Sequence, residues 1–140
     1  MNAIPTSAPS LIMSARDVRR LEALLAQAGD TLPASAARLE DEIARADVRE
    51  PAAIPADVVT MNSQVECREE PHGATRVLRL VYPKDADSSD GRVSVLAPVG
   101  AALIGLSVGQ SIDWPLPGGR STRLAVTKIL YQPEAAGLDA

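Results

Sequence analysis

The 140-residue sequence predicts an α+β fold, with a short antiparallel helical hairpin of the coiled-coil type followed by an antiparallel β-sheet domain with one short helix. Two observations predict this order. As far as Ala46, apolar residues recur at alternating steps of three and four, which is the spacing of a coiled-coil seam. From Val58 onward, apolar residues alternate with polar ones, which is typical of half-buried strands.

Four segments follow from these patterns. Residues 1–13 begin with a stretch rich in proline and serine and are expected to form a flexible tail. Residues 14–50 are expected to form the helical hairpin, called the arm below, and residues 51–57 form a linker. Residues 58–140 are expected to form the sheet domain.

The first helix of the arm has a clear start and stop. Ser14 and Asp17 have the spacing of a capping box, and Met13 and Val18 have that of a hydrophobic staple. Gly29 is suited to end the helix, because glycine readily adopts positive φ. The seam consists of Val18, Leu21, Leu25 and Ala28.

The second helix follows after a short turn. Pro33 suits its first turn, and prolines 51 and 55 bound the linker that stops it. Because each seam spans only about two heptads, the hairpin is expected to lean on another part of the molecule. The second seam consists of Leu32, Ala36, Leu39, Ile43 and Ala46.

Five strands and one short helix are expected in the sheet domain. Turns are predicted at residues 71–73 and 117–119, an exposed loop at 84–91, and a helical turn at 101–104. Pro98 is expected to end the third strand, because proline has no N–H to donate to the sheet. The predicted strands are residues 58–68, 76–82, 92–97, 111–114 and 123–131.

Composition excludes several classes of function. The net charge is −4 and the sequence has no basic block, which disfavours direct nucleic-acid binding. With one tryptophan, two tyrosines and no phenylalanine, the chain has few side chains to line an aromatic pocket. A single cysteine and no signal-peptide or membrane-spanning pattern lead us to expect a cytoplasmic protein.

No catalytic residue, metal site or cofactor is predicted, so the chain is not expected to be an enzyme. His72 is expected in a solvent-exposed turn, and Cys67 is expected to be a buried, unreactive thiol. Residues 40–42 are three consecutive acids, but successive helical side chains point about 100° apart and do not converge on a metal. The phosphate-binding and nucleophile motifs are absent.

Residues 97–105 form a run of nine uncharged residues. On pattern alone, packing of Leu103 and Ile104 against the sheet is the favoured interpretation. The alternative is that Pro98 and Val99 form an exposed apolar patch of the kind that marks a partner site.

A family resemblance rests on this segment and its neighbours. Residues 93–105 (VSVLAPVGAALIG), with Val108-Gly109 and Pro117-Gly118-Gly119, resemble the C-terminal domain of the GreA/GreB transcript cleavage factors. Residues 57–63, 81–83 and 131–137 are similar to the Rnk group of that family, the regulators of nucleoside diphosphate kinase. The resemblance covers nearly the whole chain from Ser14 onward.

The resemblance implies an FKBP-like sheet domain that docks on RNA polymerase. Its partner would be a coiled coil of the large subunit at the rim of the secondary channel, with the arm directed toward that channel. Ala97 occupies a position where Gre factors commonly have serine, so any hydrogen bond from that hydroxyl is lost. The implied docking residues are Ser94, Ala97, Pro98, Val99, Gly100 and Leu103.

The arm tip departs from the Gre pattern. In Gre factors the tip carries acids that help to hold a catalytic magnesium, whereas Gly29, Asp30 and Thr31 provide a single acid here. Residues 40–42 lie two or more turns away. A helix of about 15 residues is about 22 Å long, shorter than a long Gre-type arm, so no stimulation of transcript cleavage is expected.

The favoured function is therefore an RNA polymerase-binding regulator that competes with Gre-type factors and changes nucleoside diphosphate kinase levels through transcription. Two alternatives remain. An FKBP-like shape would suit a peptidyl-prolyl isomerase, although the scarcity of aromatic residues is against it. Direct binding to the kinase is the other, although no residues identify a surface for it.

Overall fold

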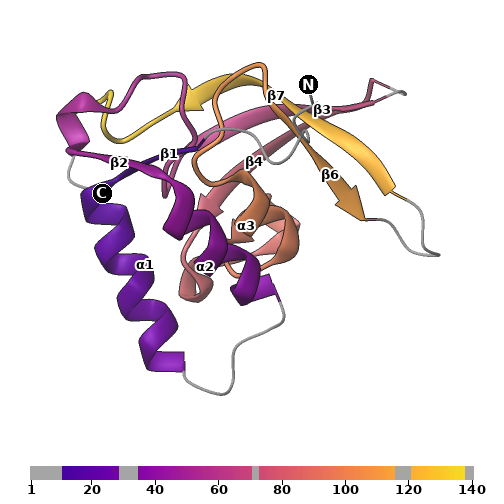
Figure 1. The fold of residues 1–140 in the computed structure, drawn as a ribbon. Coiled ribbons are helices and arrows are strands. Elements are labelled where there is room, and N and C mark those ends of the chain that lie inside the picture. Colours follow the sequence, from indigo (N-terminus) through magenta and orange to yellow (C-terminus); the bar gives the residue numbers. More distant parts are fainter. Residues whose placement is uncertain (1–10, 29–34, 71–72, 116–120, 138–140) are drawn as a thin grey trace, which may run out of the picture.

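The computed structural model describes residues 11–28, 35–70, 73–115 and 121–137. Up to residue 53, two helices lie between two short strands in the sequence, and a larger sheet follows (Figure 1). The elements are β1 Ile12–Ser14, α1 Ala15–Ala28, α2 Ser35–Arg45, β2 Asp47–Arg49, β3 Gln64–Glu70, β4 Thr75–Val81, β5 Arg92–Ser94, α3 Pro98–Leu103, β6 Ser111–Pro115 and β7 Ser121–Tyr131, with 3₁₀ turns at Pro51–Ala53, Pro83–Asp85 and Ser88–Asp90.

The main sheet has five strands in the order β5-β4-β3-β7-β6. The β3–β4, β3–β7 and β6–β7 pairs are antiparallel, but β5 lies parallel to β4, with Arg79 opposite Arg92. The expectation of a wholly antiparallel sheet is therefore wrong at this edge. The physical reason is the connection: residues 82–91 pass through two 3₁₀ turns instead of a tight hairpin, so β5 starts again from the same end as β4.

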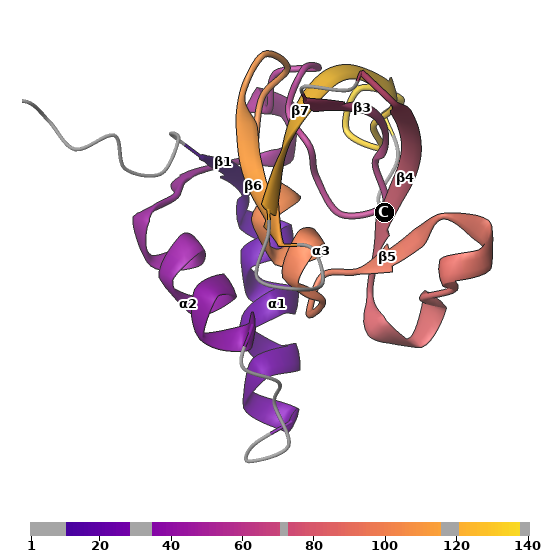
Figure 2. The ribbon, with the colours of Figure 1, turned by 90° about the vertical axis from the view of Figure 1, so that its right-hand side faces the viewer.

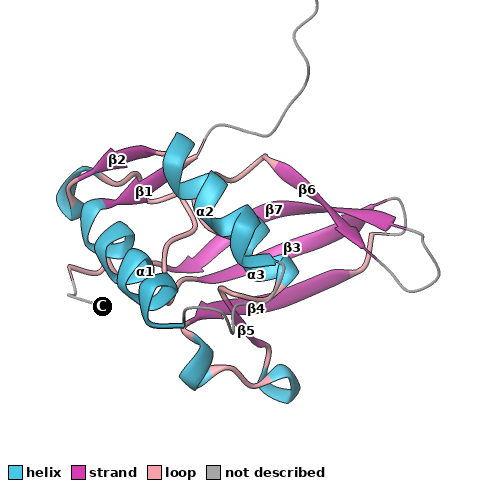
Figure 3. Cartoon of the chain, turned by 60° about the horizontal axis from the view of Figure 1, so that its bottom comes forward, coloured by secondary structure: helices cyan, strands magenta, loops and turns pink. Residues whose placement is uncertain are grey.

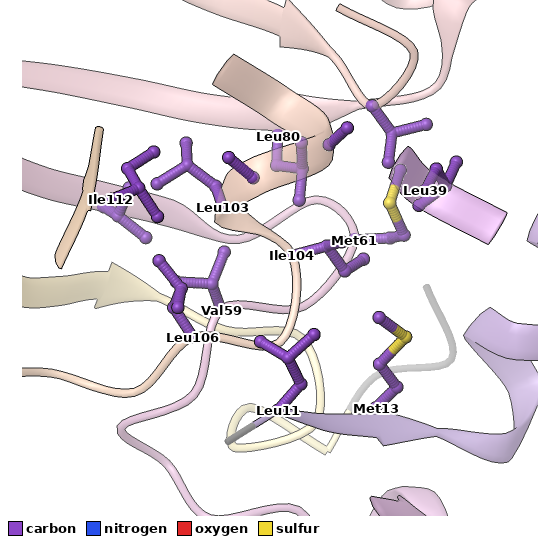
Figure 4. Packing of buried hydrophobic residues seen from close by; sticks show 14 of the residues in the cluster. Leu11, Met13, Leu39, Val59, Met61, Leu80, Leu103, Ile104, Leu106 and Ile112 are labelled. Atoms are coloured by element: carbon purple, nitrogen blue, oxygen red, sulfur yellow. The ribbon is translucent and has the colours of Figure 1, made fainter. Parts of the chain in front are cut away.

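All three helices lie on the same side of the main sheet (Figures 2 and 3). The side chains between the helices and the sheet form one hydrophobic core, to which β1, α1, α2, α3 and the sheet all contribute (Figure 4). The largest of its fully buried side chains belong to Met13, Leu21, Leu39, Met61, Leu80, Leu103, Ile104, Leu106 and Leu124.

The predicted flexible tail does not extend to residue 13. Leu11 and Met13 are 2% and 1% exposed; Leu11 precedes β1 and Met13 lies within it, and β1 pairs with β2 in parallel. The Ile12 N–H donates to the carbonyl of Gly105 at 3.1 Å, and the Asp47 N–H donates to that of Leu11 at 2.9 Å. Strand β1 is thus inserted between the two halves of the chain, while residues 1–10 lie outside the described residues.

The start of α1 is confirmed, because the Asp17 N–H donates to Ser14 Oγ at 3.0 Å. The end of the arm is corrected. Helix α2 ends at Arg45, and residues 47–49 form β2 instead of continuing the helix to residue 50. The linker also departs from expectation, because it contains a 3₁₀ turn and Ile54, which is buried. Pro33 and Leu32 lie outside the described residues.

The two helices of the arm lean on the sheet domain, as their short seams predicted. Helix α2 makes its most extensive contacts with α3, and α1 contacts β1 and β2. Ala36 and Leu39 of α2, like Leu21 and Leu25 of α1, are buried in the common core. The arm is therefore packed against the body of the molecule over these residues, and its seams serve that contact.

The first predicted strand begins too early. Strand β3 starts at Gln64, and residues 58–63 form an irregular segment in which Asn62 has a φ of 68°. Apolar and polar positions are buried alike in this segment, including Val59, Thr60 and Ser63. The apparent period of two is misleading, because the segment is covered on more than one side and does not lie on the surface of a sheet.

Candidate functional site

The docking segment, defined here as residues 94–103, is a tight bend followed by α3. Pro98 stands at the first helical position, where its missing N–H costs nothing and its φ is already helical. Ala97 caps the helix in an extended conformation without a side-chain hydrogen bond. Backbone bonds from Ala97 N–H to Ser94 O at 3.0 Å and from Ala101 N–H to Ala97 O at 2.8 Å fix the bend. The sequence had placed the start of this helix three residues later.

The six docking residues named from the resemblance differ in exposure. Pro98 is exposed, and Ser94, Ala97 and Val99 are half-buried. Gly100 is buried, and Leu103 is 1% exposed and lies in the core close to Leu80 (Figure 4). The interpretation of Leu103 and Ile104 as core residues is confirmed. Only the first part of the segment offers side chains to a partner.

Gly100 allows the start of α3 to pack closely against the backbone at the end of β5. A Cβ atom at residue 100 would lie 2.0 Å from the carbonyl oxygen of Ser94, so no other residue fits without a shift of backbone. The Ser94 hydroxyl is also engaged, because it accepts the Leu96 N–H at 3.0 Å. Ser94 and Gly100 therefore set the shape of the bend, and Pro98 is presented on a rigid support.

The predicted arm tip, Gly29, Asp30 and Thr31, lies outside the described residues. Of the three consecutive acids on α2, Glu40 and Asp41 are exposed, whereas Glu42 is buried. Glu42 pairs with Arg45 at 2.8 Å and with Arg38 at 3.6 Å. The described parts of the chain contain no group of three or more side chains suited to hold a metal ion.

Cys67 is confirmed as a buried thiol. Its side chain faces the core from β3 with no exposed surface. Burial, with a smaller contribution from Glu66, raises the pKa of the Cys67 thiol to about 11. Such a thiol stays protonated at neutral pH and is a poor nucleophile. His72 lies outside the described residues.

A groove of about 680 Å³ separates α1 from the segment after β4. Its apolar wall includes Leu24 and Pro83, and its polar side chains include Arg20 and Lys84. Among the residues that the structure describes, Tyr82 is the one aromatic side chain that lines it. The remaining groove residues are Ala23, Gln27, Asn62 and Asp85.

A buried polar junction at the base of α1 was not foreseen from the sequence. The side chain of Glu134 is 1% exposed, and its carboxylate accepts the hydroxyl of Thr60 at 2.7 Å and the guanidinium of Arg16 at 3.4 Å. Thr60 and Ser63 share a hydrogen bond at 2.8 Å. The junction thus joins α1, the segment before β3 and the turn after β7.

Asp17 is the most unusual member of this junction. Asp17 is 1% exposed. Its Oδ2 accepts the Met61 N–H at 3.1 Å instead of closing the predicted capping box. Burial and the charge of Glu134 raise the pKa of Asp17 to about 6, against the lowering effects of the Met61 N–H, Arg16 and Arg20. The local sequence offered no sign of this, because a capping box explains Asp17 without any distant partner.

Comparisons with known proteins agree with the order of the two parts of the chain. Residues 54–131 match the family described as "Transcription elongation factor, GreA/GreB, C-term", and residues 9–48 match the family "Rnk N-terminus". This chain belongs to the GreA/GreB family and carries an Rnk-type N-terminus. The family resemblance drawn from the sequence is thereby confirmed.

Named relatives within the GreA/GreB family are of two kinds. The chain is 47% identical to the "Regulator of nucleoside diphosphate kinase" of Escherichia coli K12, over 94% of this chain and 96% of that one. It is 34% identical to the transcription elongation factor GreA of Nitrobacter winogradskyi, over 59% of this chain and 52% of that one. The similarity to GreA therefore reaches only about half the length of that factor.

The fold of the family is matched in a solved structure, a GreA/GreB transcription elongation factor from Nitrosomonas europaea. That chain is 46% identical and superimposes with a TM-score of 0.74, covering 88% of this chain and 99% of the other. Its likeness extends across both parts of the molecule. Within the described residues, no helix of this GreA/GreB family member is long and apolar enough to cross a membrane.

Proposed function

We propose that this chain is a transcription regulator that binds RNA polymerase through the first part of its docking segment. The partner would be a coiled coil of the large subunit at the rim of the secondary channel, where the chain would compete with Gre-type factors. The single observation that carries the proposal is Pro98, an exposed apolar residue held by a rigid bend in a chain of the GreA/GreB family.

The local chemistry suits such a contact. Pro98 and Val99 are adjacent apolar residues at the start of α3, and the segment from Ala97 to Gly105 carries no charge that would have to be desolvated. Because the bend is fixed by backbone hydrogen bonds, little conformational entropy is lost on binding. The absence of a hydroxyl at Ala97 means that apolar contact supplies more of the affinity than it would in a serine-bearing relative.

The test is Pro98→Asp, which places a charge at the centre of the proposed contact. We expect at least a tenfold loss of affinity for purified RNA polymerase, of the size that one buried unpaired charge produces at an interface, measured by biolayer interferometry. Val77→Asp is the matched control, because Val77 is exposed on strand β4, where it is 44% accessible. Equal binding by the Pro98→Asp variant and the wild type, with unchanged melting temperatures, would reject this site.

We further propose that the chain does not stimulate transcript cleavage. Helix α1 has 14 residues, which corresponds to about 21 Å, and the only buried acid among residues 40–42, Glu42, is engaged by two arginines. A stalled elongation complex with labelled RNA and magnesium tests this directly. Shortened RNA should appear with a Gre factor and not with this chain, and cleavage at a comparable rate would contradict the proposal.

The link to nucleoside diphosphate kinase is proposed to act through transcription. It is motivated by the name of the Escherichia coli relative. Co-purification with tagged RNA polymerase, in parallel with tagged kinase, separates an indirect effect from direct binding. We expect recovery with the polymerase alone, and recovery with purified kinase would support the direct alternative.

A further inference from the structure

In the first turn of α1, the buried carboxyl group of Asp17 has a hydrogen-bond partner for only one of its two oxygens. Asp17 is 1% exposed, and while its Oδ2 accepts the Met61 N–H, its Oδ1 is buried without a hydrogen-bond partner among the described residues. An ionised carboxylate needs both oxygens solvated or bonded, and burying one of them is costly. A protonated carboxyl is better suited to this position, because it carries no charge that must be desolvated.

The groups that face Asp17 come from three parts of the chain. Arg16 and Arg20 lie on α1 itself, the phenol of Tyr82 follows β4, and Glu134 belongs to the turn after β7. Arg16 donates to the Glu134 carboxylate at 3.4 Å. A second buried carboxylate thus lies close enough to oppose ionisation of Asp17, although two arginines favour it.

Asp17 and Glu134 are hydrogen-bonded to the same turn of the chain. Met61 N–H and Thr60 Oγ1 belong to the same turn, and they donate to Asp17 and to Glu134 respectively. One carboxyl is carried by the arm and the other by the end of the chain. The state of this pair therefore bears on how firmly α1 is seated on the sheet domain.

We propose that Asp17 and Glu134 form a proton-dependent latch, in which uptake of one proton by Asp17 tightens the seating of α1 on the sheet domain. The proposal does not depend on the proposed function, since it concerns the isolated protein. It assigns to the base of the arm a sensitivity to mild acidification that the apolar contacts of α2 do not have.

The pH range follows from the direction of the pKa shift. The pKa of Asp17 is raised from 3.8 to about 6 in the seated state, so that state binds the proton more tightly than an open state does. The latch is therefore weakest above pH 6 and becomes stronger as the pH falls toward 4. Between pH 7.5 and pH 5.5, linkage gives about a fourfold increase in the ratio of seated to open molecules.

The variant-free test is an NMR titration of the Asp17 side-chain carboxyl in the wild-type protein. A midpoint near pH 6 is expected, and a midpoint near 4 would overturn the proposal. Amide hydrogen exchange in α1, corrected for the intrinsic effect of pH, should slow about fourfold between pH 7.5 and pH 5.5.

Two variants separate the latch from a purely structural role. Asp17→Asn resembles the protonated state and keeps an oxygen for the Met61 N–H. Protection of the α1 amides from hydrogen exchange should therefore be high at both pH 7.5 and pH 5.5. Glu134→Gln removes the opposing charge and should lower the midpoint of Asp17. Asp41→Asn is the control for charge, because Asp41 is exposed on α2. The same pH dependence in the Asp17→Asn variant as in the wild type would overturn the proposal.

Discussion

Both helices of the arm bury apolar residues in the common core, but their further contacts with the sheet domain are of different kinds. Helix α2 lies on α3 through buried apolar residues such as Ala36 and Leu39. The base of α1 is tied by hydrogen-bonded carboxyl groups, Asp17 and Glu134, to the turn before β3. Apolar packing is non-directional and indifferent to pH, whereas a buried carboxyl fixes one orientation and responds to protons. The first contact supplies stability, and the second supplies geometry.

The largest effect is expected where the apolar contact is removed. Leu39 is fully buried, so Leu39→Ala should lower the free energy of unfolding by about 3 kcal/mol, through lost burial and the cavity left behind. Urea denaturation followed by circular dichroism measures this. Val48→Ala, at a residue that is 46% exposed on β2, is the control and should change little. A loss below about 1 kcal/mol for Leu39→Ala would mean that α2 contributes little to the common core.

A smaller effect is expected for the hydrogen bonds of Gln132, which lies two residues before Glu134. Gln132 donates to the carbonyl oxygens of Pro55 and Val58 at 2.8 and 2.7 Å and accepts the Ala135 N–H at 3.1 Å. Gln132→Ala should cost about 2 kcal/mol, because buried carbonyls lose their donor. The same denaturation experiment measures it. If Gln132→Ala proved as costly as Leu39→Ala, buried hydrogen bonds would contribute as much to stability here as apolar packing does.

The smallest expected effect is that of pH on the wild type. Protonation of Asp17 in the folded state should raise the free energy of unfolding by about 1 kcal/mol between pH 7.5 and pH 5.5. The folded-state pKa of Asp87 is lowered by its hydrogen bonds to Ser89, so Asp87 does not add to the slope in this range. Urea midpoints across this range give the slope. A flat profile would remove the pH sensitivity that distinguishes α1 from α2.

Sequence patterns predicted the parts of the fold that depend on neighbouring residues. The start of α1 at Ser14, the seam positions Leu21 and Leu39, and the long final strand all follow from local spacing, and the structure has them. What could not be predicted depends on distant partners. Strand β1 has three residues, too few to show a period, and it exists only because β2 and Gly105 accept it. The parallel β5 depends in the same way on the path of the preceding loop.

The candidate site shows the same contrast between features set by local sequence and features set by distant partners. The uncharged run at residues 97–105 and its family resemblance predicted a candidate docking segment, but the sequence could not separate exposed Pro98 from buried Leu103. That separation arises from the close approach of Gly100 to Ser94, which only the folded backbone reveals. The junction was missed because Arg16 and Glu134 are 118 residues apart.

The position of β1 limits which parts of this fold can be exchanged between proteins. Leu11 packs beside Gly105, where an added Cβ would lie 3.1 Å from the Leu11 Cβ. The first of the described residues therefore helps to fill the core next to the sheet domain. A recombinant fragment that begins at residue 54 would lack Leu11 and Met13 and would expose the surface they cover. Replacing the arm with a different helical hairpin would therefore succeed only if residues 11–14 were kept together with the sheet domain.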